Sequence, residues 1–205
     1  TRIESKGGKA FAIAMDVRDP AAITAAVKQA VADAGQIDIL VNNSGVANTA
    51  FAIKATVEEW DTLIDTNLTG AFRVAQAVAQ HLAEAKRPGS IINIASVAAL
   101  RVAPGLAAYC ASKAGLLQLT EALALEWARY EIRVNAICPG YFITDMNRAY
   151  FESEKGKALI DRVPSKRLGQ LPDLDGPLLL LASDASRHMT GSAIKVDGGH
   201  AVSSF

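Results

Sequence analysis

Apolar runs and amphipathic stretches alternate along the chain. Short apolar runs, which are typical of buried strands, occupy residues 9–17, 37–45, 89–96, 132–140 and 192–199. Longer stretches with the apolar spacing of helices occupy residues 20–35, 57–84, 106–130 and 172–183. The apolar runs do not alternate polar with apolar positions, so we expect a parallel sheet with helices on both faces. The pattern therefore predicts an α/β fold with a doubly wound parallel sheet in three layers.

The size and charge of the chain narrow this picture. The 205 residues fit one domain over residues 1–205, and 21 basic residues balance 21 acidic ones. The sequence has no basic stripe, which argues against nucleic acid or an anionic membrane surface as a partner. Its longest apolar runs are too short to span a bilayer. We therefore expect a small-molecule partner.

The cysteines and histidines give no sign of a metal site. Cys110 and Cys138 lie in segments that we expect to be buried, and two cysteines are too few for a disulfide framework. The three histidines are scattered and lack metal-ligand spacing. The sequence predicts two reduced core thiols in a cytoplasmic protein without a metal centre.

Tyr109 and Lys113 are the first candidates for chemistry. They lie four residues apart in "AAYCASKAGLL", so on a helix they share one face. A phenol beside an ammonium group can act as a general acid and base, because the positive charge favours the phenolate form. The pair alone is a weak signal, since a buried phenol next to a lysine that reaches the surface has the same spacing.

Other polar residues strengthen this signal. Ser96 ends an apolar run thirteen residues before Tyr109, and Asn67 stands inside a helix, where asparagine disturbs the backbone. The motif "NNSG" closes another apolar run, and "PGYFIT" follows a fourth. In a doubly wound sheet, ligands bind at the carboxyl ends of the strands, which is where these residues are expected to lie.

In this order and spacing, the motifs resemble those of the short-chain dehydrogenase/reductase family in its compact, single-domain form. The similarity extends from about residue 9 to residue 199 and is close to 3-oxoacyl-carrier-protein reductases and sugar-alcohol dehydrogenases. The resemblance implies a Rossmann-like fold and NAD or NADP as the cofactor. It also implies hydride transfer that interconverts a ketone and a secondary alcohol.

The resemblance assigns catalytic roles residue by residue. Tyr109 matches the proton donor and acceptor, and Lys113 matches the residue that binds the nicotinamide ribose. Ser96 matches the catalytic serine, which can donate a hydrogen bond to the carbonyl oxygen. Asn67, in "TNLTGAF", matches the asparagine whose disturbed helix turn holds a water linked to the lysine.

The same resemblance assigns the cofactor-binding residues. Asp16 and Val17 match the pair that flanks the adenine, where the carboxylate accepts from the amine and the valine packs on the ring. The family's Asn-Asn-Ala-Gly turn, which lines the cofactor, is matched by Asn43, Ser44 and Gly45, with Ser44 in place of the usual alanine. The residues expected to contact the nicotinamide and its carboxamide are Pro139, Gly140, Phe142 and Thr144.

Two further regions carry expectations about the substrate and about assembly. Residues 141–169 form a polar, irregular stretch, interpreted either as a solvated loop or, from the resemblance, as a mobile lid over the substrate. The helices at 57–84 and 106–130 are apolar around much of their circumference. Residues that cannot all face one sheet include Ala114, Leu117, Leu125 and Trp127. This excess predicts a helix-bundle interface in a homodimer or homotetramer.

The beginning of the chain departs from the family pattern. The family's glycine-rich phosphate turn follows its first strand, and no such motif precedes residues 9–17 here. In the family, two earlier strands separate the strand that ends at Asp16 from the others, and without them a central edge of the sheet would be bare. We therefore expect the natural protein to extend N-terminally by about 40–55 residues. The alternative is that the chain closes its sheet in another way.

Two other functions are compatible with this fold. A lyase or epimerase would use Tyr109 and Lys113 with a tightly held cofactor, and a dinucleotide-sensing scaffold would keep the fold without the chemistry. The intact set of Asn67, Ser96, Tyr109 and Lys113 disfavours the scaffold, because nothing structural requires all four. The sequence therefore predicts an NAD(P)-dependent oxidoreductase.

Overall fold

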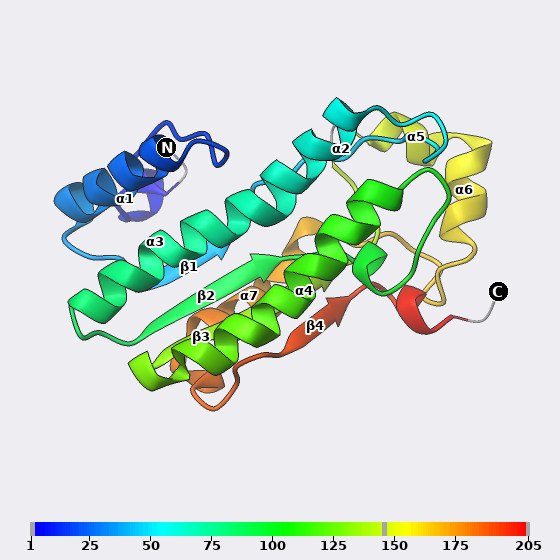
Figure 1. Cartoon of the computed structure of the whole chain (residues 1–205). Coiled ribbons are helices and arrows are strands. Elements are labelled where there is room, and N and C mark those ends of the chain that lie inside the picture. Colours follow the sequence, from blue (N-terminus) through cyan, green and yellow to red (C-terminus); the bar gives the residue numbers. More distant parts are fainter. Residues whose placement is uncertain (1–2, 145–146, 204–205) are drawn as a thin grey trace.

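The sheet of the molecule is parallel and has helices on both faces (Figure 1). The computed structural model describes residues 3–144 and 147–203. Within these residues the sheet has the order β1 (Ile39–Asn42), β2 (Gly89–Ile94), β3 (Ile132–Pro139) and β4 (Ala193–Val196). Each neighbouring pair is parallel, with Asn42 opposite Asn93 in β2. The predicted α/β fold with a parallel sheet is confirmed.

The helices form two layers around this sheet. The face shown at the front of Figure 1 is covered by α3 (Ala71–Glu84) and α4 (Ala107–Trp127), and α7 (Asp175–Ala182) packs on the other face. Outside α3 lies α1 (Pro20–Ala34). The other α-helices are α2 (Val57–Ile64), α5 (Arg148–Glu152) and α6 (Glu154–Ile160). No helix in the described part of the chain is long and apolar enough to cross a membrane.

Short 3-10 turns connect several of these elements. They occupy Glu4–Lys6, Val97–Ala99, Ala128–Tyr130, Leu171–Leu174, Asp184–Ser186 and His200–Val202. Residues 141–169, expected to be irregular, contain α5 and α6, so the expectation was wrong for these two segments. Residues 145–146 of the predicted lid lie outside the described residues.

Local signals set the helix ends that the sequence predicts. The Asp19 side chain accepts from the N–H of Ala21 at the start of α1, and Pro20 takes the first helical position. Thr56 and Glu59 form a reciprocal capping box at the start of α2. The helix predicted at 57–84 is continuous, but its middle, Asp65–Gly70, is a π-helical turn that separates α2 from α3.

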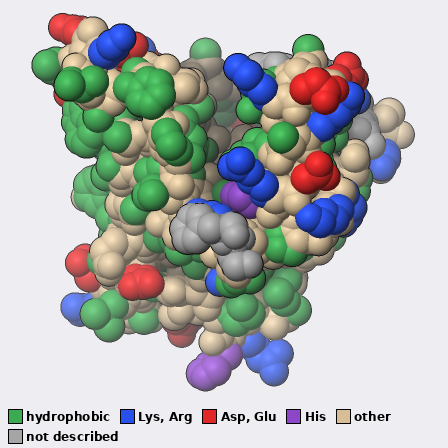
Figure 2. All heavy atoms as spheres, turned by 90° about the vertical axis from the view of Figure 1, so that its right-hand side faces the viewer, with side chains coloured by type: hydrophobic (Ala, Val, Ile, Leu, Met, Phe, Trp, Pro, Cys, Tyr) green, Lys and Arg blue, Asp and Glu red, His purple; other side chains and the backbone are tan. Residues whose placement is uncertain are grey.

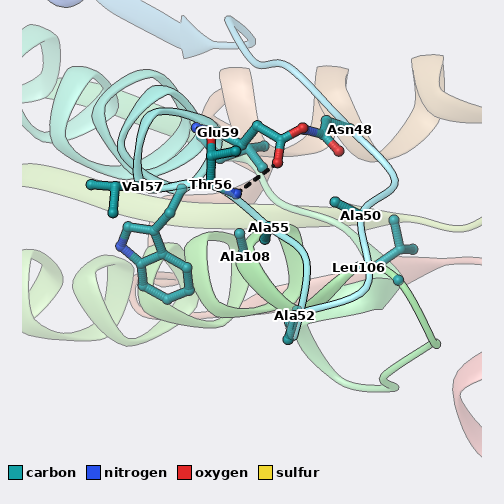
Figure 3. Close-up of a pocket in the computed structure, with 13 residues that line it drawn as sticks. Asn48, Ala50, Ala52, Ala55, Thr56, Val57, Glu59, Leu106 and Ala108 are labelled. Atoms are coloured by element: carbon teal, nitrogen blue, oxygen red, sulfur yellow. Dashed lines mark hydrogen bonds between the residues drawn. The ribbon is translucent and has the colours of Figure 1, made fainter.

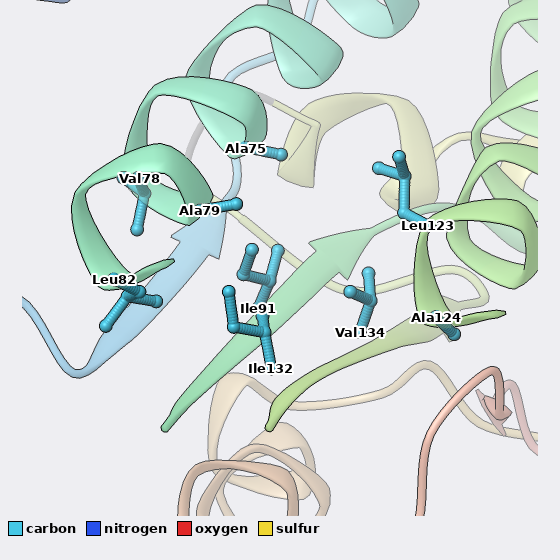
Figure 4. Close-up of a cluster of buried hydrophobic side chains, with 9 residues drawn as sticks. All are labelled: Ala75, Val78, Ala79, Leu82, Ile91, Leu123, Ala124, Ile132 and Val134. Carbon is cyan, nitrogen blue, oxygen red and sulfur yellow. The ribbon is translucent and has the colours of Figure 1, made fainter. Parts of the chain in front are cut away.

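The core lies between the sheet and the layer of α3 and α4. Figure 4 shows Leu82 of α3 and Leu123 of α4 pointing toward Ile91 and Val134 on the central strands. Leu82 and Ile91 are completely buried, and each such side chain contributes about 1.5–3 kcal/mol. A second cluster joins Ile92, Ile137 and Leu181 beneath α7. The central strands β2 and β3 are therefore buried on both faces, as predicted.

Residues 9–17 do not form the predicted strand. Strand structure depends on a hydrogen-bonded neighbour, and within the described residues this segment pairs with no strand. Several of its apolar side chains are accordingly exposed, with Phe11 at 54% and Met15 at 37%, and Val17 at its end is buried. The apolar pattern of the segment is typical of a buried strand, but a local pattern does not show whether a neighbouring strand is present.

The two outer strands are less buried than the sequence predicts. In β1, Ile39 is 44% and Val41 is 41% exposed, and in β4 Ala193 and Lys195 are exposed. The outer edge of β1 carries no further strand in the part of the chain that the structure describes. An edge strand loses the cover that a neighbouring strand and its helix provide, which explains the difference.

Candidate active site

The polar residues singled out in the sequence gather where the parallel strands end. Gly45 follows β1, Ser96 follows β2 and Pro139 ends β3. Figure 2 shows the face toward which these strands point, with a hollow between a side rich in hydrophobic groups and a side on which Lys and Arg side chains gather. The site is thus built on three neighbouring strand ends and on the helices α3 and α4 that follow them.

Asn67 lies at the centre of the π-helical turn and is completely buried. Its Oδ1 accepts from the N–H of Val46 at 2.8 Å, and its Nδ2 donates to the carbonyl of Val46 at 2.9 Å. The amide side chain therefore pairs with one peptide unit of the loop after β1, much as a strand would. A π-turn widens the helix, which is a common feature of functional sites. The helix distortion expected at Asn67 is present.

Lys113 is held under the end of β2. Its Nζ donates to the carbonyl of Ile94 at 2.8 Å and lies 5.9 Å from the centroid of the Tyr109 ring. The residue is only 5% exposed, and burial lowers its pKa from 10.5 to about 8. The one-turn spacing of Tyr109 and Lys113 on α4 thus brings a buried cation next to a half-buried phenol.

Ser96 caps the short turn that follows β2. Its Oγ accepts from the N–H of Ala98 at 3.1 Å, a bond that uses an oxygen lone pair and leaves the hydroxyl proton for another acceptor. The backbone N–H of Ser96 donates to the sulfur of Cys138 on β3, and burial raises the pKa of this thiol to about 11. Ser96 is nearly buried, and neighbouring strands fix its backbone.

The loop after β3 is held by its own hydrogen bonds. A Cβ on Gly140 would lie 2.8 Å from the Asp197 backbone, so glycine permits the close approach of this loop to the end of β4. Asn147 accepts from the N–H of Thr144 and donates to the carbonyl of Phe142, both at 2.8 Å. The predicted nicotinamide-contacting residues therefore belong to one ordered turn directly after Pro139.

A cavity of about 350 Å³ lies beside the start of α4 (Figure 3). Its wall includes Ala107 and Ala108, which directly precede Tyr109, and Trp60 and Leu63 of α2. The labelled side chains in Figure 3 are mostly small and apolar, with the Thr56–Glu59 capping pair at one side. This largely apolar cavity therefore lies next to the first turn of α4, directly before Tyr109.

Comparison with known proteins places the chain in a family. Residues 1–201 match the family described as "Enoyl-(Acyl carrier protein) reductase". A short-chain type dehydrogenase/reductase from Mycobacterium marinum is 37% identical and superimposes with a TM-score of 0.91, covering 97% of this chain and 78% of its own. This chain belongs to the short-chain dehydrogenase/reductase family. It is an NAD(P)-dependent oxidoreductase, as the sequence predicted.

Curated relatives of this enzyme include two kinds of oxidoreductase. A 2-dehydro-3-deoxy-D-gluconate 5-dehydrogenase from Dickeya dadantii is 36% identical over 97% of this chain and 79% of the relative. A 3-oxoacyl-[acyl-carrier-protein] reductase from Staphylococcus aureus is 38% identical over 96% of this chain and 79% of the relative. The structure of a gluconate 5-dehydrogenase from Burkholderia cenocepacia, in complex with NADP and tartrate, is 38% identical with a TM-score of 0.94 and covers 99% and 80% of the two chains.

The nicotinamide end of the cofactor fits the residues around Gly45. Asn43, Ser44 and Gly45 are exposed at the end of β1, where a ligand can reach their backbone. A Cβ on Gly45 would lie 3.3 Å from Asn67 Oδ1, which is tighter than most real contacts, and 3.5 Å from Lys113 Nζ, which is an ordinary contact distance. Glycine therefore leaves room beside Asn67 and close to the buried ammonium group, where a ribose hydroxyl of the cofactor could lie.

Of the predicted adenine-binding pair, Asp16 is exposed and Val17 is buried. The Asp16 carboxylate accepts from the N–H, Nε and Nη2 of Arg18, and these hydrogen bonds hold the pKa of Asp16 below its usual value. Val17 is buried with Ile23 and Val74. Both residues lie at the end of the unpaired segment 9–17.

One buried hydroxyl of the site was missed by the sequence analysis. Ser112 is completely buried on α4, and its Oγ donates to the carbonyl of Tyr109 at 2.8 Å and accepts from Asn67 Nδ2 at 3.2 Å. The available signal was its position, one residue before Lys113 and three after Tyr109 on an otherwise apolar face.

Proposed function

We propose that this enzyme interconverts a ketone and a secondary alcohol by hydride transfer, with Tyr109 as the proton donor and acceptor. The observation that carries the proposal is the buried ammonium of Lys113, fixed by the Ile94 carbonyl and 5.9 Å from the Tyr109 ring centroid. NAD or NADP, when bound, supplies or accepts the hydride. The protein supplies the binding surface, and Tyr109 supplies the proton.

In this proposal each of the four candidate residues has a separate role. Tyr109 gives its proton to the carbonyl oxygen during reduction, and Lys113 favours the resulting phenolate by its positive charge. Proton transfer by a placed group of this kind contributes about 10²–10⁴-fold to rate. Ser96 donates its hydroxyl proton, left free by the Ala98 cap, as a hydrogen bond to the same oxygen. Asn67 shapes the π-turn that lies between Val46 and α4.

We extend the proposal to the cofactor-binding residues. Gly45 and its neighbours Asn43 and Ser44 line the cofactor at the end of β1, and Lys113 binds the ribose of the nicotinamide. The ordered turn after β3 contacts the nicotinamide and its carboxamide through Pro139, Gly140, Phe142 and Thr144. The adenine contacts are Asp16 and Val17. The Asp16 carboxylate can share its oxygens between Arg18 and an amine, since it offers about four acceptor positions.

Residues 141–169 act in this proposal as a lid over the substrate. The two ends of the segment are tied together, because Phe142 pairs with Gly169 in an isolated parallel bridge. Between them lie α5 and α6, two short helices with exposed faces. Between the two ends of this segment and the end of β4, a cavity of about 280 Å³ is lined by Tyr141, Phe142 and Arg167, among others. A tied base with short helices above it is suited to open and close as a unit.

The substrate is a small carbonyl compound or alcohol. The names of the relatives, a 2-dehydro-3-deoxy-D-gluconate 5-dehydrogenase and a 3-oxoacyl-[acyl-carrier-protein] reductase, support this class.

Assembly and location complete the proposal. The outer face of α4 exposes Leu125 at 83%, with Ala107, Ala111 and Ala114 along the same helix. This face supports a homodimer or homotetramer in which α4 packs against another copy of the chain. The chain acts as a single domain in the cytoplasm. The two buried, unpaired thiols of Cys110 and Cys138 support the latter.

Turnover assays on a panel of ketones test the proposed reaction. The protein is mixed with NADH or NADPH and either a keto sugar acid or a 3-oxoacyl thioester, and cofactor absorbance and product are followed together. Steady cofactor oxidation with one alcohol formed per cofactor consumed is the expected result. Product without net cofactor change would indicate a lyase or epimerase instead, and cofactor binding without product would indicate a scaffold.

A further inference from the structure

The ring of Tyr141 lies where several loops around the site meet. It packs edge-on against Phe151 of α5, with centroids 6.0 Å apart, and against His200 after β4, with centroids 5.1 Å apart. The His200 carbonyl in turn accepts from Arg101 Nη1 at 2.7 Å, and Arg101 lies in the segment that follows Ser96. The loops that follow β2, β3 and β4 and the lid helix α5 therefore converge on this one phenol.

The Tyr141 phenol has neighbours from both α4 and the lid. Burial raises the pKa of Tyr141, the charges of Arg101 and Arg162 lower it, and the thiol of Cys110 raises it. Because such effects require short distances, these groups lie near the phenol. Cys110 directly follows Tyr109 in the first turn of α4, so Tyr141 is close to the turn that carries the proposed proton donor. Its hydroxyl keeps its proton at neutral pH and can donate a hydrogen bond.

Arg162 is placed near this phenol by the turn that follows it. Val163 is only 3% exposed and lines the same cavity of about 280 Å³ as Tyr141. The N–H of Ser165 donates to the carbonyl of Gly198 at 3.1 Å, which ties the turn to the residues after β4. The Arg162 side chain itself is exposed. Its guanidinium group therefore starts from a fixed backbone and is accessible to a ligand.

The charge of Arg162 has no carboxylate partner in the described part of the chain. Lys157 pairs with Glu154 at 2.8 Å and Arg167 pairs with Asp173 at 2.7 Å, whereas no such pair involves Arg162. Figure 2 shows Lys and Arg side chains gathered on one side of the hollow at the strand ends. A cleft lined by charge of one sign raises the local concentration of ligands with the opposite charge. The lid side of the hollow thus favours an anion.

The two groups have the chemistry of a carboxylate site. A guanidinium group donates two parallel hydrogen bonds to a carboxylate, and such charge-assisted bonds are roughly twice as strong as neutral ones. A carboxylate offers about four acceptor positions, so the Tyr141 hydroxyl can donate a further bond to it. A neutral hydroxymethyl group in the same place would leave the arginine charge without a counter-charge.

We propose that Arg162 and Tyr141 bind a carboxylate of the substrate, so that the carbonyl compound reduced beside Tyr109 is a keto acid rather than a neutral ketone. This inference rests on the proposed function, because it names the substrate class of the same site. Arg101, whose Nη1 donates to the carbonyls of His200 and Ser203, holds the wall behind Tyr141 together.

A matched pair of ketones tests the proposal. 5-Keto-D-gluconate and L-sorbose have the same carbon chain and differ in a carboxylate in place of a hydroxymethyl group. In Arg162→Gln, KM for the keto acid should rise about 10-fold to 100-fold, the factor for lost hydrogen bonds to a charged group, while KM for L-sorbose changes little. Tyr141→Phe should raise KM for the keto acid by about 2-fold to 10-fold. Equal factors for both ketones in Arg162→Gln would overturn the proposal.

Arg129→Gln is the matched control. Arg129 is also an exposed arginine, but it follows the far end of α4 from Tyr109 and lies 5.3 Å from the ring centroid of Tyr130. Its loss changes the net charge equally and should leave both KM values as they are. Arg162→Lys keeps the charge without the planar fork and should retain part of the preference for the keto acid. If Arg129→Gln raises KM for the keto acid as much as Arg162→Gln does, the effect is one of net charge and the proposal is wrong.

A binding measurement without turnover separates this inference from the proposed function. D-Gluconate and D-glucitol are the alcohols that correspond to the two ketones and differ in the same single group. In calorimetric titrations of the unaltered protein, D-gluconate should bind at least about 10-fold more tightly than D-glucitol, and Arg162→Gln should remove this difference. Equal dissociation constants in the unaltered protein would overturn the carboxylate site. If the unaltered protein reduces no ketone, the proposed function fails, and the titrations still decide whether Arg162 selects a carboxylate.

Discussion

Two adjacent residues of β1 show how differently two regions of the molecule are held. Asn42 is nearly buried, and its Nδ2 donates to the side chain of Asn93 at 3.0 Å and to the Ala71 carbonyl at 2.9 Å. Val41, one residue earlier, is 41% exposed at the outer edge of the sheet. The carboxyl end of the strand is part of a buried hydrogen-bond network with β2 and α3, whereas the outer edge of β1 has no neighbouring strand within the described residues.

The two regions differ in how many contacts their side chains make with other elements of the chain. At the strand ends, polar side chains such as Asn67 and Lys113 are buried and have partners from other elements, which fixes their orientation. Along the free edge and in residues 9–17, apolar side chains such as Val41, Phe11 and Met15 are exposed. Substitutions should therefore act on chemistry in the first region and on stability or solubility in the second.

Among the substitutions that compare the two regions, the largest difference is expected between the two ends of β2. Ser96→Ala removes a hydrogen-bond donor to the carbonyl oxygen and should lower kcat by about 10²–10³-fold. Ser90→Ala, at the other end of the strand, removes a buried bond to the Leu181 carbonyl and should leave kcat unchanged. Steady-state kinetics of both variants check this contrast, and equal losses in the two variants would place Ser96 outside the chemistry.

A substitution in the core tests how much packing between α3 and the sheet contributes to the free energy of unfolding. Leu82→Ala empties a completely buried position between α3 and the sheet and should lower the free energy of unfolding by about 2–5 kcal/mol. Val41→Ala, on the exposed edge, should cost far less. Denaturant unfolding curves give both values, and similar costs would mean that the edge is covered in solution.

The lowered pKa of Lys113 predicts a pH dependence of stability. In the folded protein this pKa is about 8, against 10.5 for an unperturbed lysine. Between these values the unfolded chain binds a proton that the folded chain does not, so the free energy of unfolding should rise with pH across this window. The rise is at most about 3 kcal/mol. Lys113→Met should lack it in unfolding curves from pH 8 upward, and identical slopes in both proteins would contradict the burial of this charge.

The smallest effect is expected at the outer edge of β1. Val41→Lys places a charge on a half-exposed edge position and should change the free energy of unfolding by only about 0.5 kcal/mol. It should reduce aggregation on storage, because a charged edge pairs poorly with another strand. Light scattering over time checks this, and a large loss of stability would show that Val41 is packed in the working protein.

The sequence predicted the parts of this structure that depend on local pattern. Helix α1, with Pro20 at its start and Gly35 after its end, and the buried strands β2 and β3 agree with their apolar spacing. The residues proposed for the site, Asn67, Ser96, Tyr109 and Lys113, lie at a strand end or on helices, as the motifs indicated. Agreement is closest where residue types at fixed spacing define the structure.

Features that depend on distant partners were beyond the sequence. Residues 9–17 have a strand-like composition, but a strand also requires a hydrogen-bonded neighbour, which no local pattern reveals. The hydrogen bond between Ser112 and Asn67 depends on the packing of the turn Asp65–Gly70 against α4, which no local pattern reveals. The widened turn at Asp65–Gly70 was anticipated only as a disturbance, since its π-helical form is set by the pairing of Asn67 with Val46.

Replacement of the Tyr109 hydroxyl tests the central claim most directly. Tyr109→Phe keeps the ring beside Lys113 and removes only the group that exchanges a proton with the substrate. Turnover of the best ketone should fall by about 10²–10⁴-fold, while the dissociation constant of NAD(P)H, measured by fluorescence titration, stays close to that of the unaltered protein. A variant that reduces the ketone at a near-normal rate would show that the proton comes from elsewhere and that the proposed site is wrong.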